Sequence, residues 1–161
     1  LVSPCCLSVC IYFDLNRTSH GVGRSALTAS SGDYVLLEHW KIRYLPSPYR
    51  MQSSSNLAPS VYKKLVMLFR SLYSLLRTLP AYRLFNRFKM VKQRHSDLHY
   101  EVGSLTSSGA GAAGFQQGNS VGGADQPSEF HFGSIGTNQG KFTIQVNYRN
   151  NVEQLMALTR P

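Results

Sequence analysis

Residues 61–85 read VYKKLVMLFRSLYSLLRTLPAYRLF, and they contain the strongest helical pattern in the chain. Its leucines recur at the spacing of an α-helix, at positions 65, 68, 72, 75, 76 and 79. Val61, Met67 and Phe69 widen the apolar surface beyond a single stripe. Because a helix that is apolar around most of its circumference packs inside a protein, the pattern predicts that this helix is the buried central element.

Two prolines mark the limits of this helix. Pro59 and Ser60 open it, and Ser60 is a candidate for the N-cap or for the first turn. Pro80 removes one backbone donor and disfavours helical geometry at Leu79. The sequence therefore predicts a bend or a break at Pro80, followed by a second helical piece over 81–91.

Five segments on either side of the helices have strand character. They contain aromatic and β-branched residues, in part with alternating polarity, and comprise Cys10–Asn16, Tyr34–Leu45, His99–Val102, Glu129–Ile135 and Lys141–Tyr148. A Gly-Thr-Asn-Gln-Gly sequence joins the last two segments, which predicts a β-hairpin.

The length of 161 residues fits one domain. Between Gly103 and Pro127 the composition changes to Gly, Ser and Ala, with too few apolar side chains to offset the entropy cost of ordering. We therefore predict a single domain over 1–161 with a disordered insertion at about 103–127. Because the chain begins with Leu1, we also expect it to be a fragment of a longer protein.

Basic residues are concentrated on the predicted helices. The chain has a formal net charge of +9. The stretch from 63 to 94 contains no acidic residue and nine basic ones: Lys63, Lys64, Arg70, Arg77, Arg83, Arg87, Lys89, Lys92 and Arg94. This cluster is either a solvated helix face or a surface for an anionic partner, such as an acidic protein, a phosphorylated group or an anionic lipid. Nucleic acid is the weaker candidate, because stacking-aromatic, zinc-finger and helix-turn-helix patterns are missing.

No pattern in the chain predicts catalysis. The eight carboxylates are scattered, and neither a nucleophile elbow nor a phosphate-binding loop is present. His95 and His99 are four residues apart, but no third ligand at a suitable spacing completes a metal site. Cys5, Cys6 and Cys10 predict buried apolar side chains. We therefore expect no enzymatic activity, no cofactor and no metal.

Three segments, in the same order along the chain, resemble the HORMA domain of the autophagy-related protein 13 family. The long helix carries the core of the likeness, with Leu72-Tyr73, Arg77 and the sequence Leu-Pro-Ala-Tyr-Arg-Leu at 79–84. Leu36–Ile42 resembles the strand of that family that contains a Glu-x-Trp sequence. Gly133–Arg149, which ends in Val-Asn-Tyr-Arg, resembles its late hairpin.

This resemblance implies an α+β, HORMA-like fold, with helices packed on an antiparallel sheet and a long central helix. It implies a non-catalytic regulatory or scaffold role in autophagy initiation, within the autophagy-related protein 1 kinase complex. The implied partners are proteins of that complex, with autophagy-related proteins 101 and 9 as further candidates. The implied location is the cytoplasm and the preautophagosomal structure. The kinase-binding motifs of the family lie in a long tail outside this chain, so kinase binding is not expected of this part.

The resemblance also implies an anion site. Basic residues of the family's domain are proposed to hold an anion such as phosphate, and the matching positions here are Arg77, Arg83 and Arg149. Guanidinium groups suit phosphate because they donate two parallel hydrogen bonds. The alternative role for these arginines is to satisfy backbone carbonyls at the interrupted helix.

A second function class remains open from the sequence: a basic module that binds nucleic acid or an anionic membrane directly. Peripheral membrane contact fits the basic cluster. A membrane-spanning segment does not, because basic side chains interrupt the apolar run of 61–79.

Overall fold

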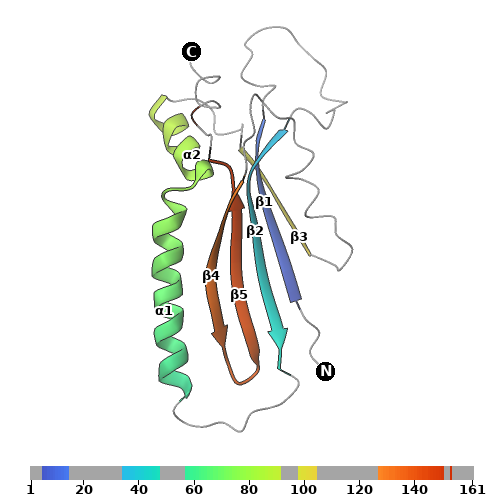
Figure 1. Ribbon diagram of the computed structural model, residues 1–161. Helices are drawn as coiled ribbons and strands as arrows, with labels where there is room; N and C mark the ends of the chain where they lie inside the picture. Colours follow the sequence, from blue (N-terminus) through green and yellow to red (C-terminus); the bar gives the residue numbers. More distant parts are fainter. Residues whose placement is uncertain are drawn as a thin grey trace.

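The computed structural model describes residues 5–14, 34–47, 57–91, 98–104, 127–150 and 153. Within these ranges the chain forms five strands and two helices (Figure 1). In chain order they are β1 (Cys5–Asp14), β2 (Tyr34–Pro46), α1 (Leu57–Leu76), α2 (Pro80–Val91), β3 (Leu98–Ser104), β4 (Ser128–Gly136) and β5 (Gly140–Tyr148).

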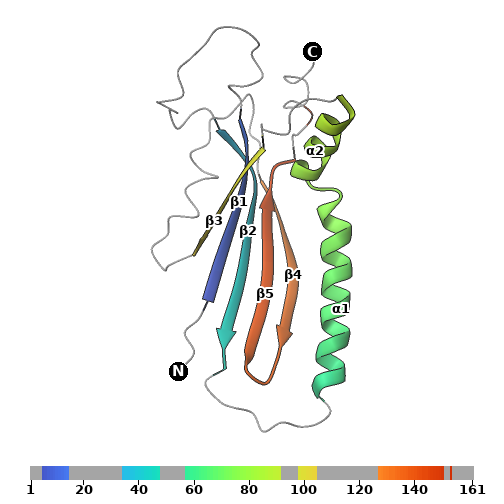
Figure 2. The same ribbon diagram turned by 180° about the vertical axis from the view of Figure 1, so that it is seen from behind.

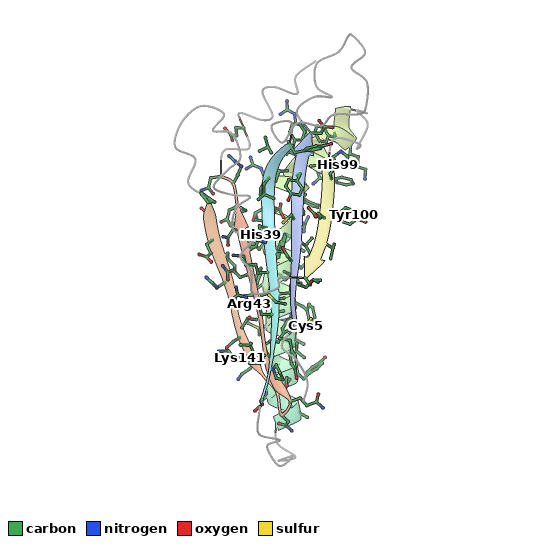
Figure 3. The ribbon with its side chains drawn as sticks, turned by 90° about the vertical axis from the view of Figure 1, so that its right-hand side faces the viewer. Cys5, His39, Arg43, His99, Tyr100 and Lys141 are labelled. Carbon is green, nitrogen blue, oxygen red and sulfur yellow. The ribbon has the colours of Figure 1, made fainter. Side chains whose placement is uncertain are left out.

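The described strands form one antiparallel sheet in the order β3-β1-β2-β5-β4. Both helices lie on the same side of this sheet (Figures 1 and 2), with α1 against β4 and α2 against β2. Figure 3 looks onto the opposite side, where the strands lie in front of the helices. The predicted α+β class, with helices packed on an antiparallel sheet and one long helix, is confirmed.

All five predicted strand segments are strands, but their limits differ from the prediction. β1 begins at Cys5 rather than Cys10, because the whole of Cys5–Asp14 pairs with β2. β3 continues through Gly103 and Ser104, which pair with β1. An insertion would therefore begin after Ser104, and residues 105–126, which make up most of the predicted insertion at about 103–127, lie outside the described residues.

The hydrophobic core lies between the sheet and the helices, in two clusters. One cluster joins β1 and β2 to α2 and comprises Phe13, Val35, Leu37, Leu84 and Phe88. The other joins β2, β4 and β5 to α1 and to the junction between the helices, and comprises Trp40, Leu68, Leu79, Ile135, Ile144 and Val146. Each helix therefore packs on the sheet through its own hydrophobic cluster, and burial of these side chains stabilises the position of each helix on the sheet.

The prediction that α1 is buried around most of its circumference was wrong. Only one stripe of the helix packs on the sheet, represented by Leu68. Tyr62, Met67 and Phe69 are between 59% and 67% exposed. The physical reason is that the described helices form a single layer on the sheet, so the sheet covers one side of α1 and leaves its other apolar side chains uncovered. The helix begins at Leu57, which places Pro59 and Ser60 in its first turn.

A bulge in the sheet directs two consecutive residues of β2 toward α2. Ile11 pairs with Glu38, whereas the next residue, Tyr12, pairs with Leu36, so Leu37 is the extra residue. Leu37 is buried in the cluster that contains α2 residues, and Glu38 bonds to the backbone of α2. Without the bulge, the alternation of a strand would place these two side chains on opposite faces.

Candidate functional site

The two helices meet at a short junction that ends α1 and starts α2. Thr78 donates from both its backbone N–H and its hydroxyl to the carbonyl of Leu75, at 2.8 Å in each case. Pro80 is the first residue of α2, where a helix has no acceptor for a backbone N–H. The side chain of Leu79 is buried between the helices and the sheet. The predicted break at Pro80 is confirmed.

Glu38 fixes the start of α2 to the sheet. One carboxylate oxygen accepts a hydrogen bond from the backbone N–H of Ala81 at 2.8 Å, and the other accepts from Nε1 of Trp40 at 3.0 Å. The N–H of Ala81 belongs to the first turn of α2, where donors lack partners within the helix and a negative charge is favoured by the helix dipole. The Glu38 carboxylate thus caps the N-terminus of α2, and Trp40 holds that carboxylate in place.

Burial governs the protonation of this carboxyl. Glu38 is 1% exposed, and burial raises its pKa above the ordinary value, while the hydrogen bonds from Ala81 and Trp40 act in the opposite direction. The ring of Trp40 in turn stacks on Phe132 of β4, with centroids 6.1 Å apart. The cap is therefore held from both the central and the edge strands of the sheet.

An apolar groove opens beside this cap. It has a volume of about 540 Å³, and it is lined by α1, α2, β1, β2 and β3. Tyr73, Leu76 and Tyr82 contribute from the helical side, and Val9 and Tyr100 from the strands. Arg77 is a cationic group in this lining.

The three arginines of the predicted anion site each have a partner within the protein. The guanidinium carbon of Arg77 lies over the ring of Tyr73, 5.8 Å from the ring centroid. Hydrogen bonds with the side chains of Asn86 and Arg77 lower the pKa of Tyr82. Arg83 is 3.7 Å from a carboxylate oxygen of Glu153.

The third arginine, Arg149, follows the end of β5 and bonds to the neighbouring strand. Its Nε donates to the carbonyl of Leu36 at 2.9 Å, and its backbone N–H donates to the carbonyl of Leu37 at 3.0 Å. Arg149 thus extends the β2–β5 pairing beside the bulge. The bond to the Leu36 carbonyl is of the kind that the alternative role predicts, although it lies in the sheet and not at the interrupted helix.

The predicted basic surface is largely accessible where the structure describes it. Lys63, Lys64, Arg70 and Lys89 are exposed, and Arg87 is half-buried. Lys92 and Arg94 lie outside the described residues. Exposed aromatic side chains lie between these cations on α1, a feature that the net charge alone does not reveal.

The side of the sheet away from the helices is polar (Figure 3). Buried His39 bonds through Nε2 to the hydroxyl of Ser8 at 2.8 Å. Burial, together with the nearby Lys41, lowers the pKa of His39 and keeps the ring neutral at pH 7. His39 is therefore a buried histidine with a hydrogen-bond partner, outside the hydrophobic core.

Two other histidines face single carboxylates. His99 is 3.9 Å from Asp14, and His131 is 3.1 Å from Glu129. Among the described residues, no group of three or more metal-ligating side chains comes together. Cys5 is exposed and Cys6 and Cys10 are only half-buried, so the expectation of buried thiols was wrong; Cys5 is the first residue of β1, at the end of the strand. No described helix has the length and apolar content to cross a membrane.

The architecture is the HORMA-like α+β fold that the sequence resemblance implies. A model of the family "Autophagy-related protein 13" matches residues 9–153. The chain therefore belongs to the autophagy-related protein 13 family.

Two individual proteins that are similar to this chain carry the same family name. The chain is 31% identical over 128 residues to autophagy-related protein 13 of Penicillium rubens, covering 77% of this chain and 13% of that protein. It is 29% identical over 139 residues to autophagy-related protein 13a of Arabidopsis thaliana, covering 83% of this chain and 20% of that protein. A solved structure described as an Atg13 HORMA domain superimposes with a TM-score of 0.49 at 20% identity, over 90% of this chain and 75% of that chain. The chain thus spans a fifth or less of the length of these two relatives.

Proposed function

We propose that this chain is a non-catalytic interaction module of the autophagy-initiation machinery, and that it acts as a regulatory scaffold in the autophagy-related protein 1 kinase complex. Membership of the autophagy-related protein 13 family supports a role in autophagy. The observation that carries the interaction role is the large apolar and basic surface on α1, because contiguous exposed apolar side chains mark docking sites in proteins. The proposed location is the cytoplasm, at the preautophagosomal structure.

Autophagy-related proteins 101 and 9 are the proposed partners. The test is co-expression of the tagged chain with each partner, followed by affinity purification and size-exclusion chromatography. We expect co-elution in a defined complex that survives physiological salt. Failure to co-elute with either protein, or with the kinase complex purified from starved cells, would contradict this proposal.

The alternative, direct binding of nucleic acid or of an anionic membrane, rests on the basic residues of α1 and α2 alone. Electrostatic binding to bulk RNA weakens steeply with salt, because it depends on release of counterions. Salt-sensitive binding to RNA or to phosphatidylserine vesicles, in the absence of any protein partner, would favour this alternative over the scaffold.

Anion sensing by Arg77, Arg83 and Arg149 is part of the proposal. Glu153, the partner of Arg83, is 84% exposed, and such an exposed ion pair is weak enough for phosphate to compete with it. We expect sulfate or phosphate to raise the melting temperature more than chloride does at equal ionic strength. Since sulfate also stabilises proteins by exclusion, the control is the triple change of these arginines to Gln, which should lose only the specific part. An unchanged response in that variant would exclude these three residues as the anion site.

A further inference from the structure

On its helix-facing side, the sheet carries apolar side chains on β1 and β3 beside the part of β1 that packs against α2. These two strands lie at the end of the strand order that is farthest from β4 and α1 (Figure 1). Val9 pairs with Val102, and Ile11 pairs with Tyr100, so these side chains share one face. Val102 is 54% exposed and Tyr100 is 78% exposed. We call the surface that these four side chains form the apolar floor.

A second apolar stripe on α1, here called the wall, adjoins the floor through its last two side chains, Tyr73 and Leu76. Its side chains are Tyr62, Phe69, Tyr73 and Leu76. At 3.6 residues per turn, their spacings of about 7, 4 and 3 residues place them along one line of the helix. This line is distinct from the buried stripe that contains Leu68. It spans about 21 Å at 1.5 Å per residue.

The wall and the floor meet in the groove next to the Glu38 cap. Tyr73 and Leu76 line the groove from α1, and Val9, Ile11 and Tyr100 line it from the strands. The groove is therefore a concave surface with apolar side chains on two sides.

The charge along the wall has one sign. Lys63, Arg70 and Arg77 follow one another every seven residues, next to the apolar stripe, and Arg77 reaches the groove. The residues from 63 to 94 contain no carboxylate to oppose them. Glu38 also lines the groove, but both of its oxygens accept hydrogen bonds from within the protein. Because these cations lack acidic neighbours on the wall, a ligand with carboxylate groups complements the charge of the wall.

We propose that the groove binds one amphipathic α-helix of a partner protein, with an apolar stripe against Tyr73 and Tyr100 and acidic side chains along the edge that faces Arg70 and Arg77. An amphipathic helix binds an apolar groove through side chains spaced at three, four and seven residues, which suits a wall of about four turns. A flat bilayer would meet the exposed edge of α1 without reaching the floor, so the concave shape favours a helix over a membrane. This inference rests on the proposed function and names the partner element that the scaffold recognises.

The probe is a fluorescein-labelled synthetic helix of about 18 residues, with Leu on one face and Glu along one edge, measured by fluorescence anisotropy against the wild-type chain. We expect saturable binding. A peptide of the same composition in scrambled order, and one with Lys in place of Glu, should each bind about tenfold more weakly or less. Equal binding of the scrambled or the Lys peptide would overturn the proposal.

Variants locate the site. Tyr73→Asp should weaken binding about tenfold, since it places a charge in the apolar wall. The matched control is Met90→Asp, because Met90 is 85% exposed on α2 and is not among the residues that line the groove. The pair of changes Arg70→Glu and Arg77→Glu should reverse the preference to the Lys peptide. Circular dichroism checks that each variant is folded, and unchanged binding in folded Tyr73→Asp would refute this location.

Two further experiments distinguish helix binding from membrane binding and from failure of the scaffold function. If phosphatidylcholine vesicles with phosphatidylserine bind the chain and Tyr73→Asp abolishes that binding, while binding of the acidic peptide does not depend on Tyr73, the surface is a membrane site and the proposal is wrong. If the peptide fails to bind while autophagy-related protein 101 still co-elutes with the chain, the groove proposal is wrong but the scaffold function stands.

Discussion

Glu38→Ala should destabilise the fold more than any other change of a single carboxylate among the described residues. The substitution removes the acceptor for the Ala81 N–H and for Trp40 Nε1 at once. Each hydrogen bond to a charged group contributes about 1.5–3 kcal/mol, and a buried donor without a partner adds a desolvation cost. The raised pKa of Glu38 shows that burying the charge carries a cost of its own, which the substitution relieves. We therefore expect a net loss of about 2–4 kcal/mol in the free energy of unfolding.

Trp40 is the single tryptophan of the chain and reports directly on this site. The assay is urea denaturation followed by tryptophan fluorescence, with Glu101→Ala on the exposed side of β3 as the matched control. Glu38→Gln should lose about 1–2 kcal/mol, because the amide accepts from one donor and presents its own N–H₂ group to the other. A loss below about 0.5 kcal/mol for Glu38→Ala would refute the cap as the contact that holds α2 to the sheet.

The same carboxyl predicts a pH dependence. Its folded pKa lies above the ordinary value of 4.5, so between these two values the folded chain binds more protons than the unfolded chain. The stability that Glu38 contributes therefore falls as the pH rises from 4.5 through the folded pKa, and is constant above it. The difference in unfolding free energy between the wild type and Glu38→Gln should shrink over that window. A flat difference would show that Glu38 is not responsible.

Other perturbations test the rest of the fold. Gly140→Ala should lose about 1–3 kcal/mol in urea denaturation, since a Cβ there would overlap a backbone carbonyl and an aromatic ring of β2, whereas Gly136→Ala has open space and should stay within about 0.5 kcal/mol. Leu68→Ala should cost about 2–5 kcal/mol by opening a cavity, and Met67→Ala less than about 0.5 kcal/mol; equal costs would mean that α1 is rotated. His39 has a pKa below its ordinary value of 6.5, so the stability it contributes is present above pH 6.5 and is lost as the pH falls through the folded pKa; this loss should be absent from the acid titration of the stability of His39→Gln.

Local sequence patterns were enough to predict the secondary structure. The alternation of Lys141–Tyr148, the leucine spacing of α1 and the proline at 80 each act through neighbouring residues, and each predicted element is present. Strand limits were harder to predict, because Cys5 and Gly103 belong to strands only through their pairing partners in β2 and β1. The Glu-x-Trp sequence was visible in β2, but nothing near it in the sequence indicates that its acceptor oxygens meet a helix that starts 42 residues later.

The helical and strand segments, the helix break and the excess positive charge on residues 63–94 could all be predicted from the sequence, because these properties depend on local propensity and composition. The buried side of α1 could not be predicted in this way, because it depends on where the sheet lies in the folded chain. Two apolar stripes on one helix are equivalent in sequence, and only the sheet's position distinguishes buried Leu68 from exposed Tyr73. In the same way, the bulge in β2 placed Leu37 beside Glu38 on the helix-facing side of the sheet, because a residue's face depends on register and not on its identity.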